Sequence, residues 1–249
     1  MQLHDLVKQL DALLQPQNYR DYAPNGLQVQ GRKEIRRIVT GVTACLDLIE
    51  QAKQREADAI LVHHGWFWKR EDPRIIGIRH RRIAELINAD MSLIAYHLPL
   101  DDHPELGNNA LLGKMLNIET DARFGDDDLA WIGSTPATMT CDQLTDVLSR
   151  ALRRPPLVVG PRDKTLRRIA WCSGAAQDML EAAVDAGADC FISGEISERT
   201  THIAREAGIT YFACGHHATE RAGIEALGRW IAERNEGVQV EFVDIDNPV

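Results

Sequence analysis

The residues of this sequence best suited to chemistry are histidines and carboxylates that occur in four small clusters. The clusters are His63 with His64, His97 with Asp101, His216 with His217, and Glu220. Imidazole and carboxylate groups are the usual protein ligands of zinc, iron and manganese. The residue types therefore predict a site for divalent metal ions, built from parts of the chain that are far apart in sequence.

The spacing of these residues adds a geometric argument. Each cluster follows an apolar run with the character of a strand, and ligands of open α/β sheets bind beyond the carboxyl ends of the strands. His63 and His64 are adjacent, and neighbours on a regular strand point to opposite faces. We expect both to reach one site because the strand has ended by then and Gly65 permits a bend. His216 and Glu220 are four residues apart, which places both on one face of a helix.

A pair of divalent ions at this site could support hydrolysis. Two cations roughly 3.5–4 Å apart can hold a bridging water, lower its pKa and stabilise charge on the reacting oxygens. A carboxylate such as Asp101 or Glu220 can bridge the two ions and offset their charge. His97, Glu195 and His217 are candidates for moving the proton of this water, because each is expected at the edge of the cleft on which the clusters converge.

Alternating helices and strands are expected to position these clusters. Helices are predicted over residues 3–14, 47–55 and 80–89, and strands over residues 37–42, 59–62, 92–96 and 238–243. These predictions rest on helical spacing of leucines, on short apolar runs and on alternation near the end of the chain. Strands that alternate with helices are typical of α/β proteins. Residues 129–159 show no clear pattern.

An internal repeat indicates that the chain has two similar halves. A shift of 131 residues places residues 38–65 over residues 169–196 without a gap. Seven aligned positions are identical, namely Ile38/Ile169, Ala44/Ala175, Asp47/Asp178, Glu50/Glu181, Ala52/Ala183, Ala57/Ala188 and Asp58/Asp189. A looser match places residues 97–101 over residues 216–220, so each half has a histidine followed four residues later by a carboxylate. Such a repeat is typical of an internal duplication.

The repeat predicts the organisation of the fold. We expect two similar α/β domains, each a layered α/β sandwich, that face each other across a cleft. Their expected bounds are residues 1–125 and 126–249, with a charged linker at residues 121–128. The strand at the end of the chain is a candidate for packing on the first half.

Composition limits the classes of protein to which the chain can belong. The net charge is −9 and the pI about 5.5, which argues against broad contact with nucleic acid or anionic membranes. The five cysteines are odd in number and lack CxxC spacing, which argues against a disulfide framework and a thiolate zinc site. No signal peptide is visible, and no apolar run approaches the ~20 residues of a membrane span. We expect a soluble cytoplasmic protein.

Other features are open to two interpretations. Trp66, Phe67 and Trp68 follow the histidine pair and could line a pocket or stack on a base, but an aromatic core or a subunit contact is an equal alternative. Residues 106–109 favour the start of a helix over a ligand-binding loop. The sequence has neither a Walker loop nor a GxGxxG motif.

Seven short motifs, considered together, resemble a known family. They are APNGLQ (residues 23–28), TGVT (40–43), VHHG (62–65), HLPLD (97–101), GNN (107–109), SGE (193–195) and GHHATE (215–220). These motifs are similar to those of the dinuclear-metal family named after the NGG-interacting factor, also called GTP cyclohydrolase 1 type 2. They look closest to its short bacterial form, YbgI. The motifs extend from the first strand to the last helix, so the resemblance covers nearly the whole chain.

The resemblance has implications for the site and for assembly. It implies two divalent metal ions, whether iron, zinc or manganese, bound by His63, His64, Asp101, His216 and Glu220, with Glu220 as the bridging ligand. It also implies a toroidal homohexamer whose sites face an interior cavity. Some members carry an inserted domain between the halves, but the ungapped repeat leaves no room for one here.

Three functions remain open from the sequence. The first is a metal-dependent hydrolase that opens a purine nucleotide ring or cleaves a phosphoester. The second is a non-enzymatic, metal-bearing ring that binds a protein partner or single-stranded nucleic acid in a stress or DNA-damage response; nucleic-acid binding would need basic residues in its pore. The third is a structural metal site. Structural sites are closed and fully ligated, whereas five ligands shared by two ions leave positions for water, which favours the hydrolase.

Overall fold

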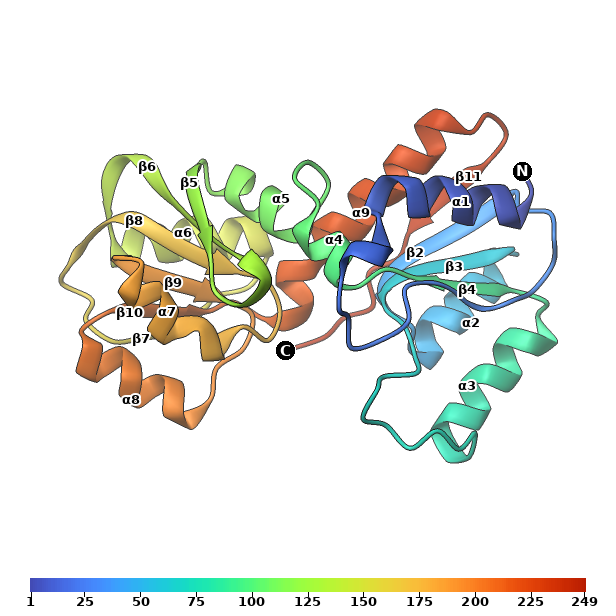
Figure 1. Cartoon of the computed structure of the whole chain (residues 1–249), viewed down its shortest axis with the longest axis horizontal. Coiled ribbons are helices and arrows are strands. Elements are labelled where there is room, and N and C mark those ends of the chain that lie inside the picture. Colours follow the sequence, from blue (N-terminus) through green and yellow to red (C-terminus); the bar gives the residue numbers. More distant parts are fainter. The chain divides into compact units, whose positions relative to one another are not determined.

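The contacts between residues divide the chain into two compact units (Figure 1). The computed structural model describes residues 1–249, with the side chain of Asp126 excepted. One unit combines Met1–Leu106 with Gly223–Asp246, and the other combines Gly107–Ala222 with Asn247–Val249. The boundary expected between residues 125 and 126 therefore differs from this division.

The first unit is built on a five-stranded sheet in the order β1-β4-β3-β2-β11. The strands are β1 (Gly26–Val29), β2 (Arg37–Thr43), β3 (Ala59–His64), β4 (Ser92–Ala95) and β11 (Gln239–Phe242). Four of them run parallel, and β1 pairs antiparallel with β4 at the edge. Because β3 lies in the middle of the sheet and helices cover both faces, the side chains of its apolar run are buried on both sides.

Helices cover both faces of this sheet. They are α1 (Leu3–Leu14), α2 (Leu46–Gln54), α3 (Gly77–Asn88), the short α4 (Leu98–Asp102) and the C-terminal part of α9 (His216–Arg234). The buried leucines of α1 and Ile224, Leu227 and Ile231 of α9 pack on one face, and α2 and α3 pack on the other. Figure 1 shows α1 separated from α2 and α3 by the strands. A 3₁₀ turn, η1 (Pro16–Asn18), follows α1.

The second unit repeats this layered arrangement around a six-stranded sheet in the order β5-β6-β8-β9-β10-β7. The strands are β5 (Glu119–Phe124), β6 (Ala130–Thr140), β7 (Leu157–Val159), β8 (Thr165–Cys172), β9 (Cys190–Ser193) and β10 (Thr210–Ala213). The helices α5 (Asn108–Met115) and α6 (Cys141–Leu152) pack on one face, and α7 (Leu180–Asp185) and α8 (Glu198–Ala207) pack on the other. Two 3₁₀ turns, η2 (Asp126–Asp128) and η3 (Gln177–Met179), complete the unit.

The two units confirm the expected α/β class and the duplication. Strands β2 and β3 are paired with Ile38 opposite Ala59, and β8 and β9 are paired with Ile169 opposite Cys190, which is the same register after the 131-residue shift. Asp58 accepts hydrogen bonds from the backbone N–H groups of residues 36 and 37, and Asp189 accepts them from residues 167 and 168. Each carboxylate therefore joins the same two strands of its own unit in the same way.

The differences from the sequence predictions lie in three segments. Residues 121–128, expected as a linker, contain the end of β5 and the turn η2, and β5 pairs antiparallel with β6. Residues 129–159, which show no pattern in sequence, form β6, α6 and β7. The strand expected at 59–62 continues through His64. Residues 106–109 hold the predicted helix start, since α5 begins at Asn108.

Membrane insertion through a helix finds no support in the residues that the structure describes, because none of their helices combines the length and apolar character of a membrane span.

Candidate metal centre

His63 and His64 are the last two residues of β3, and both belong to the same site. The expectation that the strand ends before them was wrong, yet their ring centroids lie only 4.4 Å apart. The chain leaves the sheet at Gly65, where an added Cβ would lie 2.3 Å from Gln28 Oε1 and 2.6 Å from Ala95 Cβ. Only glycine fits this close approach, so the turn that follows the two histidines is fixed by packing.

His97 joins this pair from the end of β4. Its ring centroid lies 5.1 Å from that of His63 and 5.6 Å from that of His64. One ligand atom from each of the three side chains lies within 4.8 Å of the others, which is close enough for them to hold one metal ion. Three imidazoles form a donor set suited to zinc, copper, iron or nickel. The residues of the first unit therefore fit a divalent cation by their chemistry and their spacing.

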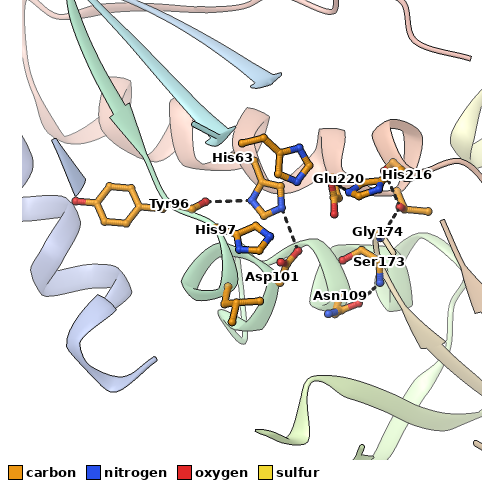
Figure 2. Close-up of polar contacts among 12 residues, drawn as sticks. His63, Tyr96, His97, Asp101, Asn109, Ser173, Gly174, His216 and Glu220 are labelled. Carbon is orange, nitrogen blue, oxygen red and sulfur yellow. Dashed lines mark hydrogen bonds and ion pairs between the residues drawn. The ribbon is translucent and has the colours of Figure 1, made fainter. Parts of the chain in front are cut away.

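Asp101 supplies a carboxylate to the same cluster. It lies on α4, four residues after His97, and its side chain is buried. Its Oδ1 lies 3.5 Å from Nε2 of His63, and a dashed line in Figure 2 marks this contact. A candidate oxygen ligand is thus next to a candidate nitrogen ligand, which is the mixed donor set that iron, manganese and zinc accept.

The Nδ1 atom of each ring in the first unit is held by a neighbour. His63 Nδ1 lies 3.0 Å from the carbonyl oxygen of Tyr96 (Figure 2), and His64 Nδ1 lies 3.2 Å from Thr43 Oγ1. His97 Nδ1 lies 2.7 Å from Asp21 Oδ1. A carbonyl or carboxylate oxygen can only accept, so Nδ1 of His63 and of His97 donates, and in the neutral ring Nε2 carries the lone pair that can bind a metal ion.

Asp21 is a partner of His97 that the sequence did not single out. The side chain is buried, and the backbone N–H of Leu98 and the amide of Asn25 donate to it at 2.9 Å. Burial alone would raise the pKa of this carboxyl, but the hydrogen bond and charge of His97, with these two donors, lower the pKa to about 2. Asp21 is therefore an ionised partner of His97 across the neutral pH range.

The second unit has its own cluster at the start of α9. His216 and Glu220 lie one turn apart, as their spacing predicts, with His216 Nε2 3.2 Å from Glu220 Oε2. Glu220 is 3% exposed. His216 Nδ1 lies 2.7 Å from Glu195 Oε1. Burial lowers the pKa of His216, but the hydrogen bonds and charges of Glu220 and Glu195 outweigh this effect and raise the pKa to about 9.

The loop after β8 packs directly against this second cluster, and the sequence pattern indicates no role for it. Gly174 has a φ of +64°, and an added Cβ would lie 2.3 Å from Glu220 Oε1 and 3.2 Å from His216 Nε2. Its backbone N–H donates to Thr219 Oγ1, and the preceding N–H, that of Ser173, donates to Asn109 Oδ1 (Figure 2). The glycine allows the two ligand candidates to lie directly against the backbone.

The remaining candidates have separate surroundings. His217 follows His216 on α9, and successive helical residues point about 100° apart, so it does not share the face of His216 and Glu220. Trp66 is core, because its side chain is buried and its Nε1 donates to the carbonyl of Ala44. Trp68 instead contacts the site, with its ring centroid 5.0 Å from that of His97 and 6.0 Å from that of His64.

Known proteins match this chain over its whole length. The chain is 51% identical over 247 residues to a protein of Allochromatium vinosum, covering 99% of this chain and 97% of that protein. It is 52% identical over 249 residues to a protein of Vibrio cholerae, covering 97% of this chain and 98% of that protein. Both relatives are named GTP cyclohydrolase 1 type 2 homolog.

Solved structures share the fold. The structure of protein ybgI, whose function is given as unknown, superposes with a TM-score of 0.95 at 42% identity and 100% coverage of both chains. TTHA1606 from Thermus thermophilus superposes with a TM-score of 0.90 at 32% identity, again with 100% coverage of both. A model of the family described as Duf34/NIF3 (NGG1p interacting factor 3) matches residues 1–248. The chain therefore belongs to the Duf34/NIF3 family.

Proposed function

We propose that this protein binds two divalent cations and is a metal-dependent hydrolase that acts on a nucleotide-like or phosphoester substrate. The proposed ligands are His63, His64, Asp101, His216 and Glu220. The observation that carries the proposal is the close approach of the ligand atoms of His63, His64 and His97 within 4.8 Å. His63 is fully buried, and a buried imidazole is costly to desolvate unless a partner compensates for the lost water, which a bound cation would do.

Different residues of the chain would perform different functions at such a site. Bound divalent cations lower the pKa of a water and stabilise charge on the reacting oxygens. Asp101 and Glu220, both buried, would offset the positive charge and hold it in a fixed position. His97, whose Nε2 is the open nitrogen, would bind a cation or carry a proton at that atom. Each of these functions requires rings that cannot rotate, and the Nδ1 contacts supply that constraint.

Aromatic side chains beside His97 support a substrate with a planar ring. The ring centroid of Tyr22 lies 6.3 Å from that of His97, and this tyrosine is 62% exposed. Trp68 lies against the same histidine. Exposed aromatic rings next to a reactive site favour stacking of a heterocycle, and base stacking is worth about 1–3 kcal/mol in proteins that bind single strands. The names of the two bacterial relatives also refer to a guanine nucleotide.

Location and assembly complete the proposal. We place the protein in the cytoplasm, because all five cysteines, which the structure describes in full, are free thiols and suit a reducing compartment.

We also propose a homohexamer. Light scattering of the purified protein should give six times the mass of 27.9 kDa. A monomer or dimer would contradict that assembly without affecting the metal site.

Glu220→Gln tests the proposal. The variant keeps the size of the side chain but removes a buried negative charge, so it should lose bound metal and hydrolytic activity together. Metal content is measured after anaerobic purification, and activity is screened against nucleotides and phosphoesters. A variant that retains its metal and its full activity would contradict the proposed role of Glu220.

Glu198→Gln is the matched control. Glu198 and His202 have the same four-residue spacing on α8 and lie 3.0 Å apart, but Glu198 is 88% exposed. This substitution should leave metal content unchanged. Salt-dependent binding of a labelled single-stranded oligonucleotide, with no turnover of any compound in the screen, would favour the non-enzymatic alternative instead.

A further inference from the structure

The two units share a feature that their aligned sequences do not reveal. His97 and His216 occupy matching positions of the repeat, and each has its Nδ1 atom 2.7 Å from a carboxylate oxygen. The carboxylates come from positions that do not match. Asp21 precedes β1 of the first unit, whereas Glu195 follows β9 of the second. The same contact is therefore made twice by different parts of the chain.

The contact differs from that of the other two histidines. His63 and His64 have neutral partners at Nδ1, a carbonyl and a hydroxyl. A carboxylate partner strengthens the bond to Nδ1–H and makes the opposite nitrogen a better electron donor, which is how such pairs tune metal ligands in proteins. One ring in each unit thus has a charged partner, and the other two rings have neutral ones.

We propose that Asp21 and Glu195 are positioning residues that hold the Nδ1–H form of His97 and His216, so that Nε2 of each ring is presented to a ligand. The inference rests on the proposed function in naming that ligand as a divalent cation, and for His97 it chooses cation binding over proton transfer. It assigns Glu195 a role through His216, in place of the proton transfer expected from the sequence. It adds Asp21 to the site.

The surroundings of Asp21 explain why a neutral substitute cannot replace it. Oδ1 accepts from His97 and from the backbone N–H of Tyr22, and Oδ2 accepts from Asn25 and from the backbone N–H of Leu98. Each oxygen therefore faces two donors. In Asp21→Asn, the new NH₂ group faces other donors whether it takes the place of Oδ1 or of Oδ2. The smaller conflict lies towards His97, because an imidazole can exchange its donor nitrogen for an acceptor.

Glu195 has a less crowded carboxylate. Among the described residues, His216 is the donor that the structure shows on its side chain, and the side chain is 35% exposed. After Glu195→Gln, the amide can turn its oxygen towards His216 and keep the hydrogen bond without the charge. Glu195→Ala removes the bond altogether. The two sites therefore respond differently to the loss of one charge.

The first measurement reads the tautomer directly in metal-free protein. Protein labelled with ¹⁵N at histidine gives separate Nδ1 and Nε2 signals, and those of His97 should show the Nδ1–H form at a pH where the ring is neutral. In Asp21→Asn the signals should change to the Nε2–H form. An unchanged tautomer in a folded variant would overturn the assignment of Asp21.

The second measurement is the affinity for Mn²⁺ or Zn²⁺ by calorimetry. Asp21→Asn and Glu195→Ala should each weaken binding about 10- to 100-fold, as the loss of such partners does elsewhere, and Glu195→Gln should weaken it less. Asp58→Asn is the control, since Asp58 is also a buried carboxylate that accepts two backbone N–H groups; it should leave affinity unchanged. Affinity within twofold of wild type in both Asp21→Asn and Glu195→Ala would overturn the inference.

The two measurements separate this inference from the proposed function. A tautomer change in Asp21→Asn, with no metal bound even by the wild-type protein, would leave the positioning role standing and remove the metal site. Normal metal binding by the wild-type protein, with an unchanged tautomer in Asp21→Asn, would leave the metal site standing and remove the positioning role of Asp21. If Asp21→Asn does not fold, Glu195→Ala in the second unit decides the affinity result by itself.

Discussion

Gly174→Ala should damage the second cluster without replacing any candidate ligand. The residue has a φ of +64°, where a side chain costs about 1 kcal/mol relative to glycine. The new Cβ would also lie 2.3 Å from Glu220 Oε1, against an ordinary contact of about 3.4 Å. The carboxylate must therefore move by roughly 1 Å inside a buried site. We expect the free energy of unfolding to fall by about 2–3 kcal/mol in total.

Metal affinity is the sensitive readout for this displacement. A ligand moved by roughly 1 Å no longer meets the short bonds of about 2.0–2.2 Å that a divalent ion makes to carboxylate oxygen, so affinity for Mn²⁺ should fall at least tenfold. Urea unfolding measures stability, and calorimetry measures affinity.

Gly187→Ala isolates the backbone contribution to that change. Gly187 has a φ of +76° in the same unit, and nothing lies within 4 Å of the position of an added Cβ. This control should lose only about 1 kcal/mol of stability and keep its metal affinity. Equal affinity in Gly174→Ala and wild type would refute the reasoning that the backbone at Gly174 positions Glu220.

Three further predictions concern carboxylates and one histidine. Asp58→Ala should destabilise more than Asp189→Ala in urea, because Asp58 also pairs with Arg32 at 2.9 Å; the reverse order would contradict this added contribution of Arg32. The pKa of Asp21 lies near 2, below its ordinary value of 3.8, so this group should supply about 2 kcal/mol of stability above pH 4 that is lost as the pH falls through 2; acid unfolding of Asp21→Asn, less steep than wild type, checks this. The pKa of His216 lies near 9 in metal-free protein, above its ordinary value of 6.5, so its stabilising contribution is complete below pH 6.5 and is lost as the pH rises through 9. A cation must displace its proton, and affinity should therefore rise about tenfold per pH unit from 7 to 9; calorimetry showing a flat profile would contradict this.

Periodic segments were predictable from the sequence, because burial imposes a pattern on them. The first helix has the predicted bounds of residues 3–14, since its leucines alternate with polar residues at helical spacing. The register of the duplicated strands followed from the ungapped repeat. By contrast, β5 is largely exposed and carries the charged run of residues 119–124, so it has no apolar pattern, and a linker was predicted in its place.

The contacts of the site were harder to predict than its residue types. Clusters of histidine and carboxylate are visible in the sequence, but the partner of His97 is Asp21, a common turn residue distant in the chain. The contact of Gly174 with the site was equally hard to predict, because a glycine after a strand has many ordinary explanations. Only the packed structure shows which carboxylate meets which ring, since that information is held in long-range contacts and not in local spacing.

The exchange between His64 and Glu195 has an evolutionary consequence. These residues lie at the ends of equivalent strands of the duplicated fold, yet one is an imidazole with a hydroxyl partner and the other a carboxylate that contacts His216. An ancestral gene whose two copies were still identical would have offered the same residue at both places. Divergence of the two copies then allowed a histidine at this position in one copy and a carboxylate that contacts His216 in the other. A single copy would have had to give up its histidine to gain that carboxylate. Glu195→His would make the two positions identical again in the present protein.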